Sequence, residues 1–214
     1  MLGTLPNLLT LSRILLIPIL IATFFIAAPW ANWAAVALFS TAAITDYFDG
    51  YLARARKQQS RLGAFLDPVA DKLLVAATLL MLVAVDRVTG LTTVAAVIIL
   101  CREILVSGLR EFLAALSVGL PVTHLAKWKT AIQMVALAVL LVGDAAPAEW
   151  RAAEIGIAGL WAAAVLTVVT GYSYLRIGLR HMMEDEDSPA LDGEATEPVP
   201  PLDAPPLSGG GNGT

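Results

Sequence analysis

The chain has 214 residues, of which 57% are hydrophobic and 15% are charged, and its mean hydropathy is +0.74. This composition is too apolar for a soluble domain of this length, so it excludes most soluble enzymes and predicts an all-α membrane protein. The net charge of −4 is unevenly divided, because residues 1–183 carry 14 bases against 10 acids and every other acid lies beyond them.

Six apolar segments follow one another along the chain, each close to the roughly 20 residues that a helix needs to cross a bilayer. Trp30, Trp33 and Trp150 stand at breaks between these segments, where tryptophan anchors membrane proteins at the lipid–water interface. We therefore expect six transmembrane helices. Their expected ranges are Leu5–Trp30, Asn32–Ala55, Gly63–Val85, Leu91–Leu116, Ala126–Val142 and Ala152–Ile177.

Lysine and arginine are distributed asymmetrically over the ends of these helices. Twelve would lie on one side, and only Arg87 and Arg151 on the other. Because cytoplasmic loops are enriched in basic residues, the first side and both termini are expected in the cytoplasm, in a multi-pass protein of a bacterial-type cell (inner) membrane. The twelve are Arg13, Arg54, Arg56, Lys57, Arg61, Lys72, Arg102, Arg110, Lys127, Lys129, Arg176 and Arg180.

Four aspartates interrupt the second and third segments, in the stretch "DYFDGYLARARKQQSRLGAFLDPVAD" from Asp46 to Asp71. The uncharged run before Asp46 covers about 21 Å, and the run after Lys72 about 20 Å, of a hydrocarbon core that is roughly 30 Å thick. Lipid-exposed carboxylates at this depth are costly. We therefore expect the helices to surround a polar cavity that opens to the cytoplasmic side.

The spacing of the four aspartates places each pair on one helical face, since Asp46 and Asp49 are three apart and Asp67 and Asp71 four. A short turn between the two helices allows the pairs to meet. Clustered carboxylates repel one another unless cations neutralise them, and two divalent ions would match the charge. Oxygen ligands favour Mg²⁺, Mn²⁺ or Ca²⁺, and the absence of Cys and His nearby argues against zinc.

Two other interpretations of this stretch stay open. Asp67 is also suited to cap a helix that has Pro68 in its first turn. The acids would alternatively pair with the bases of an ordinary charged loop, namely Arg54, Arg56, Lys57 and Arg61.

The residues from Asp46 to Asp71 match a known signature at each fixed position. They resemble the motif of the CDP-alcohol phosphotransferases, which are six-helix membrane enzymes that join a CDP-activated lipid to an alcohol and release CMP. The segments "LPNLLTLSRI", "CREILVSGLREFLA" and "AKWKTAIQMVALA" are similar to family members that use CDP-diacylglycerol and glycerol 3-phosphate. The motif in this chain is Asp46-x-x-Asp49-Gly50-x-x-Ala53-Arg54, eight residues, then Gly63-x-x-x-Asp67-x-x-x-Asp71.

The resemblance covers roughly Leu5 to Arg180 and implies a phosphatidyltransferase domain over residues 1–183. Residues 184–214 are acidic, rich in Pro and Gly and without aromatics, so we expect a disordered tail. The family implies two ions of Mg²⁺ or Mn²⁺ as cofactors and a homodimer. Membrane lipids are expected as further partners, and nucleic acid is not.

The resemblance also implies a role for each matching residue. Asp46, Asp49 and Asp67 would hold one metal ion. Asp46, Asp67 and Asp71 would hold the other, and Asp71 would also be the general base. The CDP-diacylglycerol contacts would be Asn7, Thr10, Arg13, Gly50, Ala53, Arg54, Ser60 and Gly63.

A phosphorylated acceptor needs cations. Arg102 and Arg110 are eight residues apart, close to two helical turns, so both guanidinium groups can face one way, and Arg binds phosphate oxygens well. Lys127 and Lys129 would add charge at the mouth. The alternative is that the two arginines pair with the neighbouring Glu103 and Glu111, or with lipid phosphate.

Other activities stay open beside transfer to glycerol 3-phosphate. A sister enzyme of the family would use inositol phosphate, or phosphatidylglycerol as in cardiolipin synthesis. A divalent-cation transporter is a more remote alternative, because transporters of repeated architecture carry acids on several spans, whereas here they crowd into one hairpin.

Overall fold

The structure, a computed structural model, describes the backbone of residues 5–56, 61–115 and 124–186, and the side chains of residues 9–45, 63, 66–114 and 124–179. The chain divides into two units, Met1–Gly178 and Leu179–Thr214, and the packing described here belongs to the first. All regular elements of the described part are helical. They are α1 (Leu5–Thr23), α2 (Pro29–Arg56), α3 (Arg61–Ala84), α4 (Leu91–Ala115), α5 (His124–Val142), η1 (Gly143–Ala145), η2 (Ala148–Trp150) and α6 (Ala152–Glu186).

The six described α-helices coincide with the six predicted segments, apart from their ends. The first segment was expected to continue to Trp30, but α1 ends at Thr23, because the backbone turns there with the amide of Phe24 bonded to the Ile21 carbonyl at 3.1 Å. Pro29 then starts α2, a position where its fixed φ suits a helix and its missing N–H costs nothing. The expected tail from residue 184 falls outside the described residues, except for the end of α6.

The start of helix α3 tests the interpretation that Asp67 caps a helix. It begins at Arg61, so Pro68 lies inside the helix and Asp67 does not cap it. Lys72 lies one turn after Pro68, and its Nζ atom donates a hydrogen bond to the Pro68 carbonyl at 2.9 Å. The capping interpretation is therefore wrong, and Asp67 and Asp71 stand one turn apart on one continuous helix.

Three helices of the described part are long and apolar enough to cross a membrane, over Leu91–Ala114, His124–Ala145 and Ala148–Leu179. Much of their apolar surface faces outward: Ile104 of α4 is 67% exposed and Val165 of α6 is 59% exposed. Exposing such large apolar surfaces to water is unfavourable, whereas contact with lipid chains carries no such cost. These features are those of an α-helical membrane protein.

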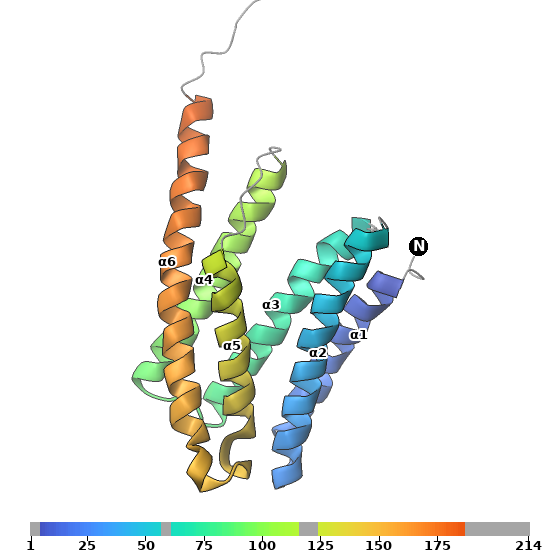
Figure 1. The fold of residues 1–214 in the computed structure, drawn as a ribbon, viewed down its shortest axis with the longest axis vertical. Coiled ribbons are helices and arrows are strands. Elements are labelled where there is room, and N and C mark those ends of the chain that lie inside the picture. Colours follow the sequence, from blue (N-terminus) through green and yellow to red (C-terminus); the bar gives the residue numbers. More distant parts are fainter. Residues whose placement is uncertain (1–4, 57–60, 116–123, 187–214) are drawn as a thin grey trace, which may run out of the picture. The chain divides into compact units, whose positions relative to one another are not determined.

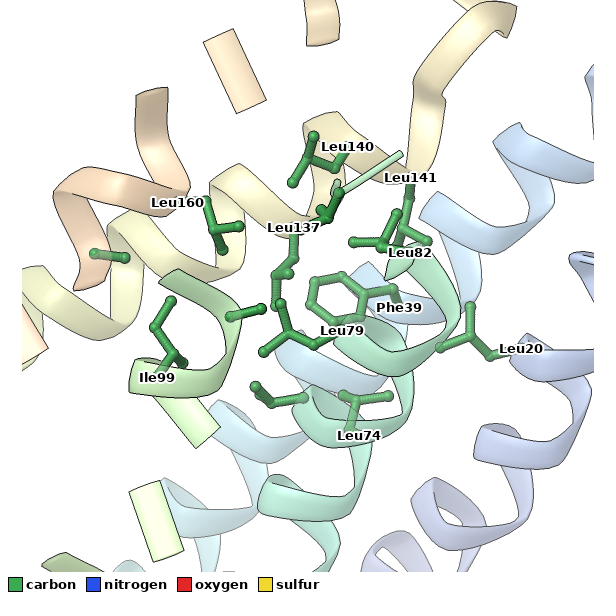
Figure 2. Packing of buried hydrophobic residues seen from close by; sticks show 14 of the residues in the cluster. Leu20, Phe39, Leu74, Leu79, Leu82, Ile99, Leu137, Leu140, Leu141 and Leu160 are labelled. Atoms are coloured by element: carbon green, nitrogen blue, oxygen red, sulfur yellow. The ribbon is translucent and has the colours of Figure 1, made fainter. Parts of the chain in front are cut away.

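Small and apolar side chains form the core where the helices meet. Helices α1, α2 and α3 pack side by side, and α5 packs against α2 and α3 (Figure 1). Figure 2 shows Phe39 of α2 beside Leu79 and Leu82 of α3 and Leu137 of α5. Because lipid is as apolar as the core, close packing rather than the hydrophobic effect must hold these helices together. The fully buried Ala42 of α2 lets its neighbours approach closely.

Arg87, in the loop between α3 and α4, closes the C-terminal end of α5. Its Nη1 atom donates hydrogen bonds to the carbonyls of Leu141 at 2.7 Å and Leu140 at 3.3 Å, which the helix itself leaves without donors. Burial lowers the pKa of the guanidinium from its usual value, and the negative charge of Asp144 opposes that shift. The arginine thereby ties the α3–α4 loop to the end of α5.

A cavity of about 550 Å³ lies beside this arginine, between the α1–α2 turn, the α3–α4 loop and the α5–α6 connection. Trp33 of α2 and Trp150 of η2 meet edge to face at the same end of the helices, with ring centroids 6.3 Å apart. No residue predicted for catalysis, metal or substrate lines this cavity.

Candidate functional site

The predicted metal and nucleotide residues on α1 and α3 lie close together. The Thr10 hydroxyl of α1 donates a hydrogen bond to Oδ1 of Asp67 on α3. Thr10 is fully buried, and Arg13, one turn further along α1, is 1% exposed. Asp67 and Asp71 are both partly buried. The structure thus brings Thr10 to one of the two α3 carboxylates, as a shared nucleotide and metal site requires.

The other half of the predicted metal site lies on α2. Asp46, Asp49, Gly50, Ala53 and Arg54 belong to this helix, but their side chains lie outside the described residues. The same holds for the side chain of Asn7 on α1 and for Ser60 as a whole. Among the side chains that are described, no three acidic, His or Cys residues gather as metal ligands would. The four-aspartate metal site stays a prediction.

A cluster of charged side chains lies buried between α4 and α5. Lys129 of α5 is 3% exposed, and its Nζ atom donates a hydrogen bond to Oε1 of Glu103 on α4. The same carboxylate oxygen lies 3.6 Å from Nη1 of Arg102. A buried ammonium group is tolerated only when paired, so Glu103 holds two cations at one place. We call these three residues, Lys129, Glu103 and Arg102, the charged cluster.

Helix α6 fixes the Arg102 side of the charged cluster. Nη2 of Arg102 donates a hydrogen bond to the Thr170 hydroxyl at 3.0 Å, and its guanidinium carbon lies 5.9 Å from the centroid of the Tyr174 ring. Gly171 makes this approach possible, because a Cβ there would lie 3.1 Å from Cγ of Arg102. Residues of two helices, α4 and α6, therefore hold this guanidinium group.

The charged cluster and the α3 carboxylates form one electrostatic environment. The charges of Glu103 and Arg102 act on Lys129, and the negative charge of Asp71 on α3 acts on it more weakly. The predicted general base is thus within electrostatic range of the predicted phosphate-binding lysine, although they are 58 residues apart in the sequence. Transfer to a phosphorylated alcohol needs a carboxylate and a cation, and both kinds of group belong to this electrostatic environment.

The structure separates the four predicted acceptor residues into two pairs. Arg102 and Lys129 converge in the charged cluster, whereas Arg110 and Lys127 are exposed. The expectation that both arginines bind the acceptor's phosphate stays a prediction: Arg110 is exposed, and its charge acts on Arg102. The proposed alternative, in which Arg102 pairs with Glu103, does occur at 3.6 Å, but Lys129 shares that carboxylate.

Sequence reasoning missed several polar residues of this region. Glu103 was considered only as a neighbour of Arg102, and Gln133 and Thr170 were not considered. Gln133 is 2% exposed, and its Oε1 atom has no hydrogen-bond partner in the described part of the chain. A polar residue one turn from Lys129 in an apolar helix was the available signal, since such residues usually face the interior of the bundle.

The fold and the site define an α-helical membrane protein with a charged site inside its helices. The model of the CDP-alcohol phosphatidyltransferase family matches residues 3–169, most of the chain. The chain belongs to this family, and it is a phosphatidyltransferase.

Several curated proteins that are similar to this chain are named after the same activity. Proteins called CDP-diacylglycerol–glycerol-3-phosphate 3-phosphatidyltransferase include one from Rickettsia bellii, 46% identical over 80% of this chain and 93% of its own length. One from Pseudomonas fluorescens is 46% identical over 84% of this chain and 92% of its length. One from Arabidopsis thaliana is 44% identical over 81% of this chain and 78% of its length.

Solved structures with the same fold include phosphatidylinositol phosphate synthase of Mycobacterium tuberculosis. The apo form has a TM-score of 0.57 at 21% identity and covers 82% of this chain and 89% of its own. The form with manganese and citrate has a TM-score of 0.58 at 20% identity, over 83% and 84%. At this identity the likeness establishes the fold.

Proposed function

We propose that this chain transfers the phosphatidyl group of CDP-diacylglycerol to sn-glycerol 3-phosphate, giving phosphatidylglycerophosphate and CMP in phospholipid biosynthesis. The names of relatives that are 37–46% identical support both substrates. The observation that carries the proposal is the buried charged cluster within electrostatic range of Asp71. It offers two cations to an acceptor's phosphate, and Asp71 is a carboxylate that can accept the proton of the acceptor's hydroxyl.

The protein spans a cell membrane of bacterial type with six helices, its site and both termini on the cytoplasmic side. Three long apolar helices support the membrane setting, and the distribution of Lys and Arg supports the orientation. Residues 1–183 form the phosphatidyltransferase domain, residues 184–214 form a tail without a catalytic role, and the enzyme works as a homodimer.

Two divalent ions, Mg²⁺ or Mn²⁺, belong to this site. Asp46, Asp49, Asp67 and Asp71 would hold them, and the donor set fits, because carboxylate oxygens suit hard cations and Asp67 and Asp71 share one face of α3. The form of the solved relative that contains manganese supports this. When bound, such ions offset the charge of diphosphate oxygens and of the leaving group.

The residues of the chain divide the remaining work. Asp71 accepts the proton of the acceptor's hydroxyl, whose oxygen forms a bond to the phosphorus that carries diacylglycerol. The bond between that phosphorus and CMP breaks, and CMP leaves with the electron pair. Lys129 and Arg102 hold the acceptor's phosphate. Arg54 contacts the diphosphate, with Gly50, Ala53 and Gly63 close to the nucleotide, and the further contacts are Asn7, Thr10, Arg13 and Ser60.

An assay of the purified protein in detergent tests this function. With CDP-diacylglycerol and labelled glycerol 3-phosphate, label should enter lipid with one CMP released per lipid formed. EDTA should abolish the reaction, and Mg²⁺ or Mn²⁺ should restore it. Parallel reactions with inositol phosphate and with phosphatidylglycerol are the controls, and label incorporated only from inositol phosphate would assign the chain to the sister activity.

A further inference from the structure

Glu103 has a carboxylate oxygen that its cationic neighbours do not use. Both Lys129 and Arg102 approach Oε1. The second oxygen, Oε2, accepts no hydrogen bond from any residue that the structure describes, and the side chain keeps 20% of its surface exposed. A carboxylate carries about four lone-pair sites. The charged cluster therefore contains an open hydrogen-bond acceptor beside two cations.

Glu103 pairs with the buried Lys129 when no ligand is bound, but a bound phosphate could neutralise Lys129 itself, so phosphate binding alone does not require this acid. Its negative charge opposes the binding of any phosphate dianion near Lys129 and Arg102, since like charges repel. A hydroxyl group, by contrast, can donate a hydrogen bond to the carboxylate, and hydrogen bonds to charged groups are the strong ones. The charged cluster thus favours a molecule that carries a phosphate and a hydroxyl over phosphate alone.

Gln133 extends the same polar surface. It lies one helical turn from Lys129 on the same face of α5, and its buried Oε1 atom has no partner among the described residues. Such a buried acceptor destabilises the protein unless a donor reaches it. A hydroxylated ligand or a water that it orders would supply that donor.

We propose that Glu103 determines the specificity for the acceptor: Oε2 receives a hydrogen bond from the hydroxyl that does not react, while Lys129 and Arg102 bind the phosphate. This inference rests on the proposed function, in which the terminal hydroxyl of glycerol 3-phosphate attacks and the middle hydroxyl is spectator. A site that binds a substrate hydroxyl rejects the analogue that lacks it, because its own polar group is then left unpaired.

The test compares glycerol 3-phosphate with 3-hydroxypropyl phosphate, which keeps the phosphate and the terminal hydroxyl and lacks the middle one. The full-length enzyme should prefer glycerol 3-phosphate by about 30-fold in kcat/KM, as one charge-assisted hydrogen bond allows. Glu103→Gln should reduce this preference to about 3-fold. Glu103→Asp, which keeps the charge and shortens the side chain, should give an intermediate preference and serves if the Gln variant does not fold.

The matched control is Glu111→Gln, because Arg110 and Glu111 repeat the Arg-Glu pair of the charged cluster on an exposed surface of α4. It should keep the full preference. Inhibition by inorganic phosphate gives a second readout: it should strengthen by about 5-fold in Glu103→Gln, since a repelling charge is removed.

Two results overturn the inference. If Glu103→Gln lowers kcat/KM for both acceptors by the same factor, Glu103 is only structural. If the unaltered enzyme has the same kcat/KM for the two acceptors, no residue of the site recognises the middle hydroxyl. Failure of the proposed function looks different, because the unaltered enzyme would then transfer to neither acceptor.

Discussion

The Thr10 hydroxyl donates a hydrogen bond to the Asp67 carboxylate and so joins α1 to α3 across 57 residues of sequence. Thr10 is completely buried, whereas Asp67 is only partly so. A hydrogen bond to a carboxylate both stabilises its charge and fixes its direction. Thr10 therefore orients a predicted metal ligand, in addition to the nucleotide contact that the family resemblance implies.

Replacing Thr10 by Val tests this orienting role, because the shape is kept and the donor is removed. We expect kcat to fall about 10-fold, and the Mn²⁺ concentration for half-maximal activity to rise by a similar factor, as losing a partner that positions a ligand typically does. The measurement is a metal titration of activity. Ser12→Ala is the control on the same helix, since Ser12 is exposed and, among the described residues, its hydroxyl bonds only to the Leu9 carbonyl. An unchanged metal requirement in Thr10→Val would contradict this role.

Asp71→Asn removes the proposed base with little change in shape. General-base catalysis contributes about 10²–10⁴-fold, and a lost metal ligand adds to that, so kcat should fall at least 10³-fold while the protein stays folded. The matched control is Asp86→Asn in the α3–α4 loop, where φ is 57° and Asn tolerates the left-handed conformation. Full turnover in Asp71→Asn would remove its assignment as the base.

The two lysines of α5 give a paired test of the acceptor site. Lys129 is buried against Glu103, whereas Lys127 is exposed. Lys129→Met should raise KM for glycerol 3-phosphate at least about 10-fold, which corresponds to the loss of one charge-assisted hydrogen bond, and leave KM for CDP-diacylglycerol unchanged. Lys127→Met should change it by less than about 3-fold, because a solvated charge contributes little. Equal effects would place the acceptor at the exposed mouth instead.

Gly143 should be the least replaceable described glycine of the loops. Its φ is 49°, and a Cβ atom there would lie 2.5 Å from Cζ of Arg87. Gly143→Ala should destabilise the protein by about 2–4 kcal/mol, combining left-handed strain with displacement of the arginine that caps α5. Gly90→Ala is the control, with a similar φ of 55° but no atom within 4 Å, and should cost about 1–2 kcal/mol. Thermal unfolding in detergent measures both, and equal losses would exclude the clash.

The positions of the helices could be predicted from sequence, because hydrophobic runs and their breaks are local properties. The ends of helices were harder to predict, because backbone hydrogen bonds in the following turn determine where a helix ends. The bond between Phe24 and Ile21 at the end of α1 is an example. Proline was misleading at Pro68, where the helix continues through a residue that usually ends or begins one. The three apolar helices α4, α5 and α6 were the clearest, since each contains a long stretch of high mean hydropathy.

The motif from Asp46 to Asp71 and the excess of Lys and Arg at one end are fixed by the amino-acid sequence, and with them the family and its chemistry. The pairing of charges was decided by the tertiary structure alone. Arg102 and Arg110 look equivalent in the sequence, but only Arg102 is close enough to share Glu103 with Lys129. A buried charge must find its partner in three dimensions, and that partner lies on another helix, where no local pattern of residues can specify it.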